Sequence, residues 1–485
     1  MSKISLKKNF VMNTLYTMST FLFSLITFPY ISRVLGPDGN GRVTFATSFI
    51  SYFTLVAQLG IPTYGIRVCA EARDDRVALT RVTHELLMIN LIMTALSYAA
   101  LFAALFTVPR LMEDRALFLI ISSTLFLSAV GMEWLYRGLE QYTYITVRSL
   151  IFKAIALVAT FLLVRAESDY MIYGAISIFA TSASNICNFI YARKYVDFHP
   201  VGGYDLKRHW KPVMVFFAMA CATTLYTYLD VVMLGFMTTD TDVGYYNAAV
   251  KIKRILVTLI TSLGTVLLPR ASYYIGKGLM NEFRRVISRS LNFVFLLSVP
   301  LALYFAYFAP QTILLLSGGA YAPSVEPMRW IIPTLPLIGI TNVLGIQILV
   351  PTGREKTVLW SELAGAGTDL VLNALLIPSL RSTGAAIGTL AAEAVVLAVQ
   401  YAALRKEAGP LFARVSYGKL ILAAAAGSAL CFWVPLAGWG NFPTLAAGAV
   451  LFFGGYGATL LLTREPLTWE LTGQVLGRLN RGGKK

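Results

Sequence analysis

Charged side chains are sparse in this sequence, and seven cations stand within or at the edges of long apolar runs. Of the 485 residues, 56% are hydrophobic and only 14% are charged. The seven cations are Arg33, Arg67, Lys153, Lys251, Lys253, Arg254 and Arg270. Guanidinium and ammonium groups bind phosphate oxygens, so these side chains are candidate binding residues for an anionic ligand. The alternative is that they anchor helix ends at the headgroups or follow from the sidedness of basic loops.

Three carboxylates lie at comparable depth in the apolar runs. Asp369 and Glu393 fall near the middles of two runs, and Asp230 falls toward the end of another. A carboxylate in hydrocarbon is costly unless it is paired or protonated. We therefore predict that these acids form ion pairs within a helix bundle, or couple it to protons or sodium ions.

The sequence offers little for metal binding or catalysis. The three histidines, His84, His199 and His209, fall in expected loops, and the four cysteines are far apart with no CxxC motif. These residues give little from which a histidine-built metal site or a catalytic triad could be formed. We expect no metal, no catalytic residue and no cofactor beyond a coupling ion, and therefore a protein that is not an enzyme.

The apolar runs themselves predict an all-α integral membrane protein. The mean hydropathy is +0.65, a value that the surface of a soluble chain of this length does not carry. Runs of about 20 apolar residues are long enough to span a bilayer as helices. Fourteen such segments are predicted, near residues 10–31, 43–64, 86–109, 116–135, 149–165, 170–192, 212–237, 243–268, 290–309, 330–350, 358–378, 384–404, 420–438 and 443–463.

Basic residues distribute unevenly over the loops between these segments. With the N-terminus inside, the inner segments hold 30 lysines and arginines and the outer turns hold 10. Basic residues concentrate on the cytoplasmic side of membrane proteins, so we predict a multi-pass protein of the cell membrane, that is, the inner or plasma membrane, with both termini in the cytoplasm. The net charge of +16 then reflects topology and contact with anionic membrane lipids, and no nucleic-acid partner is needed.

An internal repeat relates the two halves of the chain. Gly41 and Arg67 match Gly244 and Arg270 at an offset of 203 residues, and Gly174 matches Gly384 at an offset of 210. Six helices per copy is an even number, so both copies start on the same side and form parallel repeats about an axis along the membrane normal.

The repeat predicts three parts with different roles. An N-terminal lobe spans residues 1–209, a C-terminal lobe spans 210–407, and residues 408–485 add two helices and a cytoplasmic tail. Two lobes of this kind enclose a cavity. Arg33 and Lys251 would make its outer half basic, and Arg67 and Arg270 would lie toward the inner side.

Several motifs in order resemble one known family. The stretch "FPYISRVLGPDGNGRVTFATSFISYFTLVAQLGIPTYGIR" is similar to polysaccharide flippases of the Wzx type, and so are "GMEWLYRGLEQYTYITVRS", "LGTVLLPRAS" and "LIPSLRSTGAAIGTLAAE". These flippases belong to the superfamily of multidrug, oligosaccharidyl-lipid and polysaccharide exporters, which also contains the MATE exporters and the lipid II flippases. The resemblance covers the first twelve helices.

The resemblance implies translocation of an undecaprenyl-diphosphate-linked oligosaccharide, such as an O-antigen unit, from the inner to the outer leaflet by alternating access. Arg33 matches an arginine that lines the cavity of lipid II flippases, and Arg67 resembles one that follows a proline of helix two. A further arginine of those flippases has no counterpart, because Pro37 and Asp38 stand in its place. We therefore expect the substrate to carry a glycan other than that of lipid II.

The resemblance leaves partners and rival functions to consider. Candidate partners are the lipid-linked glycan, membrane lipids and other polysaccharide assembly proteins, and the two-lobe design implies a functional monomer. Two alternatives remain, a cation-coupled drug or small-molecule exporter of the same superfamily and a membrane polysaccharide polymerase or glycosyltransferase. Most of the charges within the membrane are basic and the outer loops are short, so both alternatives rank below the flippase.

Overall fold

The computed structural model describes residues 6–470 and 472–473, and within this part of the chain it consists of helices without any strand. The all-α prediction is therefore confirmed. The chain divides into two compact units, Met1–Gly244 and Tyr245–Lys485. Of the tail that the sequence places in the cytoplasm, residues 474–485 lie outside the described residues.

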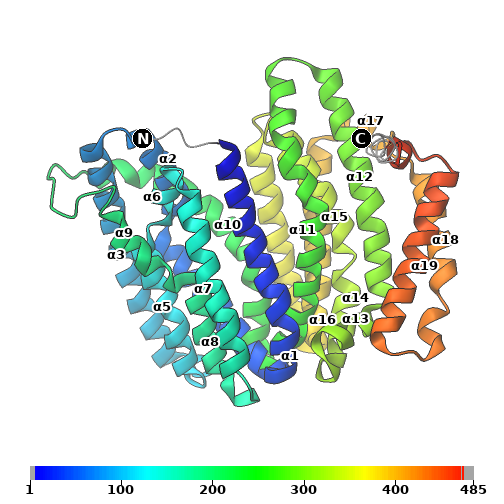
Figure 1. Cartoon of the computed structure of the whole chain (residues 1–485), viewed down its shortest axis with the longest axis horizontal. Helices are drawn as coiled ribbons and strands as arrows, with labels where there is room; N and C mark the ends of the chain where they lie inside the picture. The colour runs from blue at the N-terminus through cyan, green and yellow to red at the C-terminus, as the bar shows by residue number, and fades with distance from the viewer. Residues whose placement is uncertain (1–5, 471, 474–485) are drawn as a thin grey trace, which may run out of the picture. The chain divides into compact units, whose positions relative to one another are not determined.

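The first unit contains ten complete α-helices, one 3₁₀ turn and one π-helical turn among its described residues, and it also contains the start of α11. They are α1 (Leu6–Gln58), α2 (Ile61–Ala72), α3 (Arg76–Thr107), α4 (Pro109–Met112), α5 (Arg115–Gly131), α6 (Glu133–Gly138), α7 (Tyr142–Leu163), the 3₁₀ turn η1 (Glu167–Asp169), α8 (Tyr170–Ile178), the π-helical turn η2 (Phe179–Ala183), α9 (Asn185–Ala192), α10 (Lys207–Met237) and α11 (Asp240–Gly276). Within this unit α7 and α8 lie side by side, and α1 contacts α3, α5, α7 and α10 (Figure 1).

The second unit continues α11 and ends in a helical hairpin. Its elements are α12 (Met280–Tyr307), α13 (Ala309–Ser317), the 3₁₀ turn η3 (Gly319–Ser324), α14 (Val325–Ile331), α15 (Thr334–Asn342), the π-helical turn η4 (Val343–Leu349), α16 (Glu355–Ala403), α17 (Arg405–Phe412), α18 (Tyr417–Cys431), the 3₁₀ turn η5 (Val434–Ala437) and α19 (Asn441–Leu462). The hairpin of α18 and α19 is drawn in orange and red in Figure 1.

Among the described residues nine helices are long and apolar enough to cross a membrane, and a bent pair at 319–331 and 334–349 makes a tenth if it is one span. Two of the nine, Val11–Ala72 and Glu355–Ala403, each run through two of the fourteen predicted segments. The chain is thus a multi-pass membrane protein, and the number fourteen stays a prediction.

Two of the predicted loops are only kinks. We expected helices to end near 31 and begin again near 43, yet α1 is interrupted at Gly36 alone, where φ is 63°. Likewise α16 continues through the predicted gap at 379–383, with a non-helical residue at Arg381. Glycine reaches positive φ without a steric penalty, so the first kink needs no longer loop. The predicted helix ends were therefore wrong at both places.

The expected outer turns of the first unit gather at one of its ends. Arg42 Nη1 lies 2.9 Å from Asp114 Oδ2, and Arg110 Nη2 lies 2.6 Å from Asp240 Oδ1. Tyr170 donates a hydrogen bond to Asp114 at 3.0 Å. These contacts join α1 just after its kink and the start of α8 to the residue before α5, and α4 to the start of α11. Arg42 therefore neutralises a carboxylate of its own unit.

The expected inner turns meet at the other end of the same unit. Arg76 Nη2 lies 2.7 Å from Asp197 Oδ1. The fully buried Glu85 accepts hydrogen bonds from Asp205 N at 2.7 Å and from the Arg208 guanidinium. Because α3 runs from this end to the other over 32 residues, or about 48 Å, the expected inner and outer turns lie at opposite ends of this unit. Which end faces the cytoplasm stays a prediction.

The glycines of the internal repeat lie at a helix crossing. A Cβ atom at Gly41 would stand 1.7 Å from Asp240 O, and one at Gly244 would stand 2.0 Å from Pro37 O. The repeat relates these two contacts to each other, because Gly41 corresponds to Gly244 and Pro37 corresponds to Asp240, each at an offset of 203 residues. Thr241 Oγ1 also donates to Asp38 Oδ1 at 3.4 Å, again across 203 residues. The crossing therefore has an approximate two-fold axis, as parallel repeats require.

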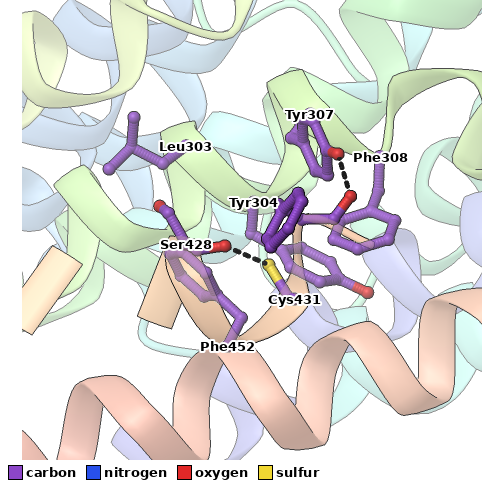
Figure 2. A pocket seen from close by; sticks show the side chains of 8 residues that line it. Leu303, Tyr304, Tyr307, Phe308, Ser428, Cys431 and Phe452 are labelled. Atoms are coloured by element: carbon purple, nitrogen blue, oxygen red, sulfur yellow. Dashed lines mark hydrogen bonds between the residues drawn. The ribbon is translucent and has the colours of Figure 1, made fainter. Parts of the chain in front are cut away.

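In the second unit an apolar cavity of about 180 Å³ lies where α12 meets α18 and α19. Rings of Tyr304, Tyr307, Phe308 and Phe452 surround it (Figure 2). Tyr307 donates to the carbonyl of Phe432 at 2.6 Å. This cavity offers few polar partners, and its rings tie the terminal hairpin to the unit.

A buried carboxylate fixes the chain directly after α19. Glu465 is fully buried and accepts hydrogen bonds from Asn292 Nδ2 at 2.6 Å and from the backbone and side chain of Thr468 at 2.6 and 2.8 Å. Burial alone would raise the pKa of this carboxyl, but the hydrogen bonds outweigh it and hold the pKa below the ordinary value of glutamate.

Candidate functional site

A break between α5 and α6 positions the main charged cluster of the first unit. Met132 adopts φ 41°, which ends α5 at Gly131 and starts α6 at Glu133. Asn188 Nδ2 of α9 donates to the carbonyl of Gly131 at 2.7 Å, and Tyr136 donates to the carbonyl of Asn188. The freed backbone groups are thus satisfied by a neighbouring helix, as broken helices in membranes need.

Glu133 is the anionic centre of this cluster. Its Oε1 accepts hydrogen bonds from Arg137 Nε at 2.9 Å and Nη2 at 2.6 Å. Arg148 Nη2 lies 3.7 Å from Glu133 Oε2, and Arg148 is only 7% exposed. Arg148 Nε and Nη1 have no acceptor among the residues that the structure describes. One carboxylate therefore faces two guanidinium groups.

Lys153 adds a third cation through a tyrosine of α1. Its Nζ lies 4.9 Å from the centre of the Tyr16 ring and donates to Ser19 Oγ at 3.0 Å and Thr20 Oγ1 at 2.5 Å. The Arg137 guanidinium lies 5.9 Å from the same ring. We call Glu133, Arg137, Arg148 and Lys153 the Glu133 cluster. With three cations and one carboxylate, it carries an excess of positive charge inside a membrane-spanning unit.

A polar pocket of about 370 Å³ opens beside this cluster. Glu133 and Arg137 line it, together with Asn90, Trp134 and Asn185. We call it the charged pocket. Its mixture of charged groups, amides and an indole can bind an anion that also carries hydroxyl groups.

A second pocket of about 300 Å³ adjoins the first and shares Gln58, Pro62 and Thr63 with it. Its remaining polar wall consists of hydroxyl groups, and no charged residue lines it. We call it the neutral pocket. The hydroxyl-bearing residues that are not shared are Ser51, Thr54, Thr124, Thr224 and Tyr228.

The structure places the predicted cations in different surroundings. Lys153 is 7% exposed and belongs to the Glu133 cluster. Arg67 is exposed on α2 and pairs with Glu71 at 3.0 Å. Arg33 is exposed on α1, directly before the kink. Of the four cations on α11, Lys251 and Lys253 are half-buried, and Arg254 and Arg270 are exposed. A shared basic cavity of the two lobes stays a prediction.

The three predicted acids are buried. Asp230, Asp369 and Glu393 are 6%, 3% and 5% exposed. Gly388 lets the two halves of α16 approach, since a Cβ there would stand 3.1 Å from Asp369 Oδ1. Within the described part of the chain no group of histidine, cysteine or acidic residues could hold a metal ion. A role of these acids in ion coupling stays a prediction.

Arg137 and Arg148 were missed from the sequence. Both fall near a predicted inner loop, where the sidedness of basic residues explains them equally well. A signal was available, because Glu133 and Arg137 stand four residues apart, the spacing that brings two side chains together on a helix.

Helices of this length and hydropathy, with buried charges between them, define a polytopic membrane protein. A family model described as "Polysaccharide biosynthesis protein" matches residues 6–274, and a second one described as "MatE" matches 216–375. The chain belongs to the polysaccharide biosynthesis protein family. The resemblance seen in the sequence motifs is thereby confirmed.

Curated relatives carry names that agree with this family. A putative O-antigen transporter of Escherichia coli (strain K12) is 25% identical over 403 residues, which is 81% of this chain and 95% of that protein. A probable flippase of Haloferax volcanii, AglR, is 28% identical over 171 residues, which is 34% of this chain and 35% of the relative. Both names describe transport, in agreement with the expectation of a protein that is not an enzyme.

Solved structures show the same fold. The lipid II flippase MurJ in an inward closed conformation aligns with a TM-score of 0.72 at 14% identity, covering 94% of this chain and all of that one. An inward-facing multidrug transporter of the MATE family aligns with a TM-score of 0.61 at 13% identity, covering 83% and 98%. The architecture is thus that of the superfamily named from the sequence motifs.

Proposed function

We propose that this protein is a flippase for a lipid-linked oligosaccharide, which it moves from the inner to the outer leaflet. The observation that carries the proposal is the charge of the Glu133 cluster, with three cations around one carboxylate in a membrane-spanning unit. A diphosphate cannot cross hydrocarbon unaided, and guanidinium groups provide forked donors for its oxygens. Membership of the polysaccharide biosynthesis family and the O-antigen transporter relatives support the same substrate class.

The carrier of the oligosaccharide in this proposal is undecaprenyl diphosphate. The headgroup would pass between the two lobes by alternating access while the polyprenyl tail stays in lipid. Arg33, Arg67, Lys251 and Arg270 would line this path, and Asp369 or Glu393 would couple it to a proton or sodium gradient. Both termini would lie in the cytoplasm, and one chain would suffice for transport.

The rival exporter of cationic drugs fits the charge less well. A site for a cation needs an excess of acids or aromatic faces, whereas Arg137, Arg148 and Lys153 outnumber Glu133. The solved structures of MATE transporters support the fold of this chain, and they do not indicate its substrate.

The test is transfer of an undecaprenyl-diphosphate-linked oligosaccharide in proteoliposomes, measured by its accessibility to an enzyme added outside. We expect transfer that depends on the protein and falls at least tenfold in Arg137→Gln. Arg76→Gln is the matched control, because Arg76 is also ion-paired but is exposed at one end of the same unit, away from the Glu133 cluster. Transfer equal to that of empty vesicles with several glycans, under imposed ion gradients, would contradict the proposal. Efflux of cationic dyes instead would favour the exporter.

A further inference from the structure

The two adjoining pockets of the first unit differ in their polar walls, because charged side chains line one and only uncharged side chains line the other. A glycosyl diphosphate lipid likewise has a charged diphosphate next to an uncharged sugar. The charged pocket contains Arg137 and Glu133, while the neutral pocket contains hydroxyls, an amide and two partly exposed rings. We infer that the pockets form one two-part site, in which the charged pocket holds the diphosphate and the neutral pocket holds the sugar next to it. This inference rests on the proposed function, since it takes the ligand to be a glycosyl diphosphate lipid.

The break between α1 and α2 lies beside both pockets. Leu59 adopts φ 47°, and Gly60 precedes α2. A Cβ atom at Gly60 would stand 2.5 Å from both Phe216 Cβ and Val213 O, so only glycine lets α10 approach this closely. Gln58 lies directly before the break and lines both pockets. Its amide can donate and accept, which suits a position between phosphate and hydroxyl groups.

The charged pocket contains polar atoms that still need a partner. Asn90 Oδ1, Trp134 Nε1 and Asn185 Oδ1 have no hydrogen-bond partner among the described residues, and all three residues are buried. Unsatisfied buried groups destabilise a protein, so a ligand or water that reaches them is favoured. Two acceptors and one donor on this wall, beside the guanidinium of Arg137, suit a ligand with both hydroxyls and anionic oxygens.

The neutral pocket has the chemistry that a sugar ring requires. Tyr228 and Phe216 are half-buried and present aromatic faces, which pack against the C–H face of a pyranose. The hydroxyls of Ser51 and Thr54 donate to backbone carbonyls of α1 at 2.8 and 3.0 Å, so their lone pairs remain as acceptors. A free anion gains little from the acceptor lone pairs of these two hydroxyls. The neutral pocket therefore selects for the glycan and not for the lipid carrier.

The experiment separates the sugar's contribution from that of the diphosphate. The purified full chain in nanodiscs is titrated with undecaprenyl diphosphate and, separately, with the same lipid bearing the oligosaccharide. We expect the sugar to tighten binding by the wild type. Thr224→Val and Tyr228→Phe should weaken binding of the glycan-bearing lipid about 3- to 10-fold each and leave the bare lipid unchanged, the loss expected for one hydrogen bond. Arg137→Gln should weaken both ligands alike.

A neighbouring threonine provides the matched control. Thr223 stands beside Thr224 on α10 but is exposed and does not line the pocket, so Thr223→Val should bind both lipids as the wild type does. The near-isosteric Tyr228→Phe and Thr224→Val changes guard against loss of folding. If both variants bind the glycan-bearing lipid as tightly as the wild type does, the inference of a two-part site is wrong. The proposed function then still stands, provided that the protein transports the lipid. Failure of the wild type to bind either lipid would remove the proposed function as well.

Discussion

The crossing of Gly41 and Gly244 predicts a specific and measurable loss of stability. In Gly41→Ala the new Cβ would start 1.7 Å from Asp240 O, and it must withdraw by about 1.3 Å to reach the shortest contact that real Cβ atoms make. Overpacking of this kind costs about 1–3 kcal/mol, or more when the obstacle is backbone. The gain in helix propensity from glycine to alanine returns at most about 1 kcal/mol. We expect a net destabilisation of about 1–2 kcal/mol for Gly41→Ala and a similar value for Gly244→Ala.

The assay is thermal or denaturant unfolding of the purified protein in one detergent. Gly367→Ala is the control, since a Cβ there meets no atom within 4 Å in the helix α16 and should be neutral or stabilising. The double variant at Gly41 and Gly244 should lose less than the sum of the single variants, because one separation of the two segments relieves both clashes. Gly41→Ala with the stability of the wild type, or strict additivity in the double variant, would refute this reasoning.

Four further outcomes follow from individual side chains. Arg42→Ala should destabilise the protein, because the buried Asp114 loses its cation. Arg33→Ala should reduce transport and change the unfolding temperature by no more than about one degree. Unfolding and flipping are measured for both variants. Asp369→Asn should change the response of transport to an imposed proton or sodium gradient, and an unaltered response would reduce Asp369 to a packing residue. Because the folded-state pKa of Glu465 lies below its unfolded value, its contribution to stability is present above about pH 4.3 and is lost as the pH falls through the folded-state value. Glu465→Gln should therefore flatten the acid limb of the pH–stability curve, and an acid limb as steep as that of the wild type would count against this assignment.

Composition and periodicity were sufficient for the fold class, because apolar runs of this length leave only a helical membrane protein. The repeat was also visible, since the matched glycines occupy positions where any side chain would clash. Helix ends were less accessible. At Gly36 and at Arg381 the chain turns at a single residue. Glycine, proline and aspartate in a sequence predict that a turn is present, but they do not predict its length.

The candidate site was only partly predictable. Lys153 stood out because it lies well inside an apolar run, but Arg137 and Arg148 lie where basic residues are common for reasons of topology. What separates them from ordinary loop residues is the break at Met132, which turns Glu133 and Arg137 toward a pocket. No sequence pattern predicts that a methionine adopts a left-handed backbone conformation. The neutral pocket was invisible for a related reason, since serine and threonine are ordinary residues of membrane helices.

The two-fold crossing of Gly41 and Gly244 also bears on the ancestry of the chain. Each side presents the same local surface to the other, the relation that joins two identical subunits in a symmetric dimer. A half-length protein with the six predicted helices would insert both copies in one orientation, and the copies could pair through this glycine contact without any linker. Fusion of two such genes then preserves the interface, and it frees each half to change its own pockets independently, which a homodimer cannot do.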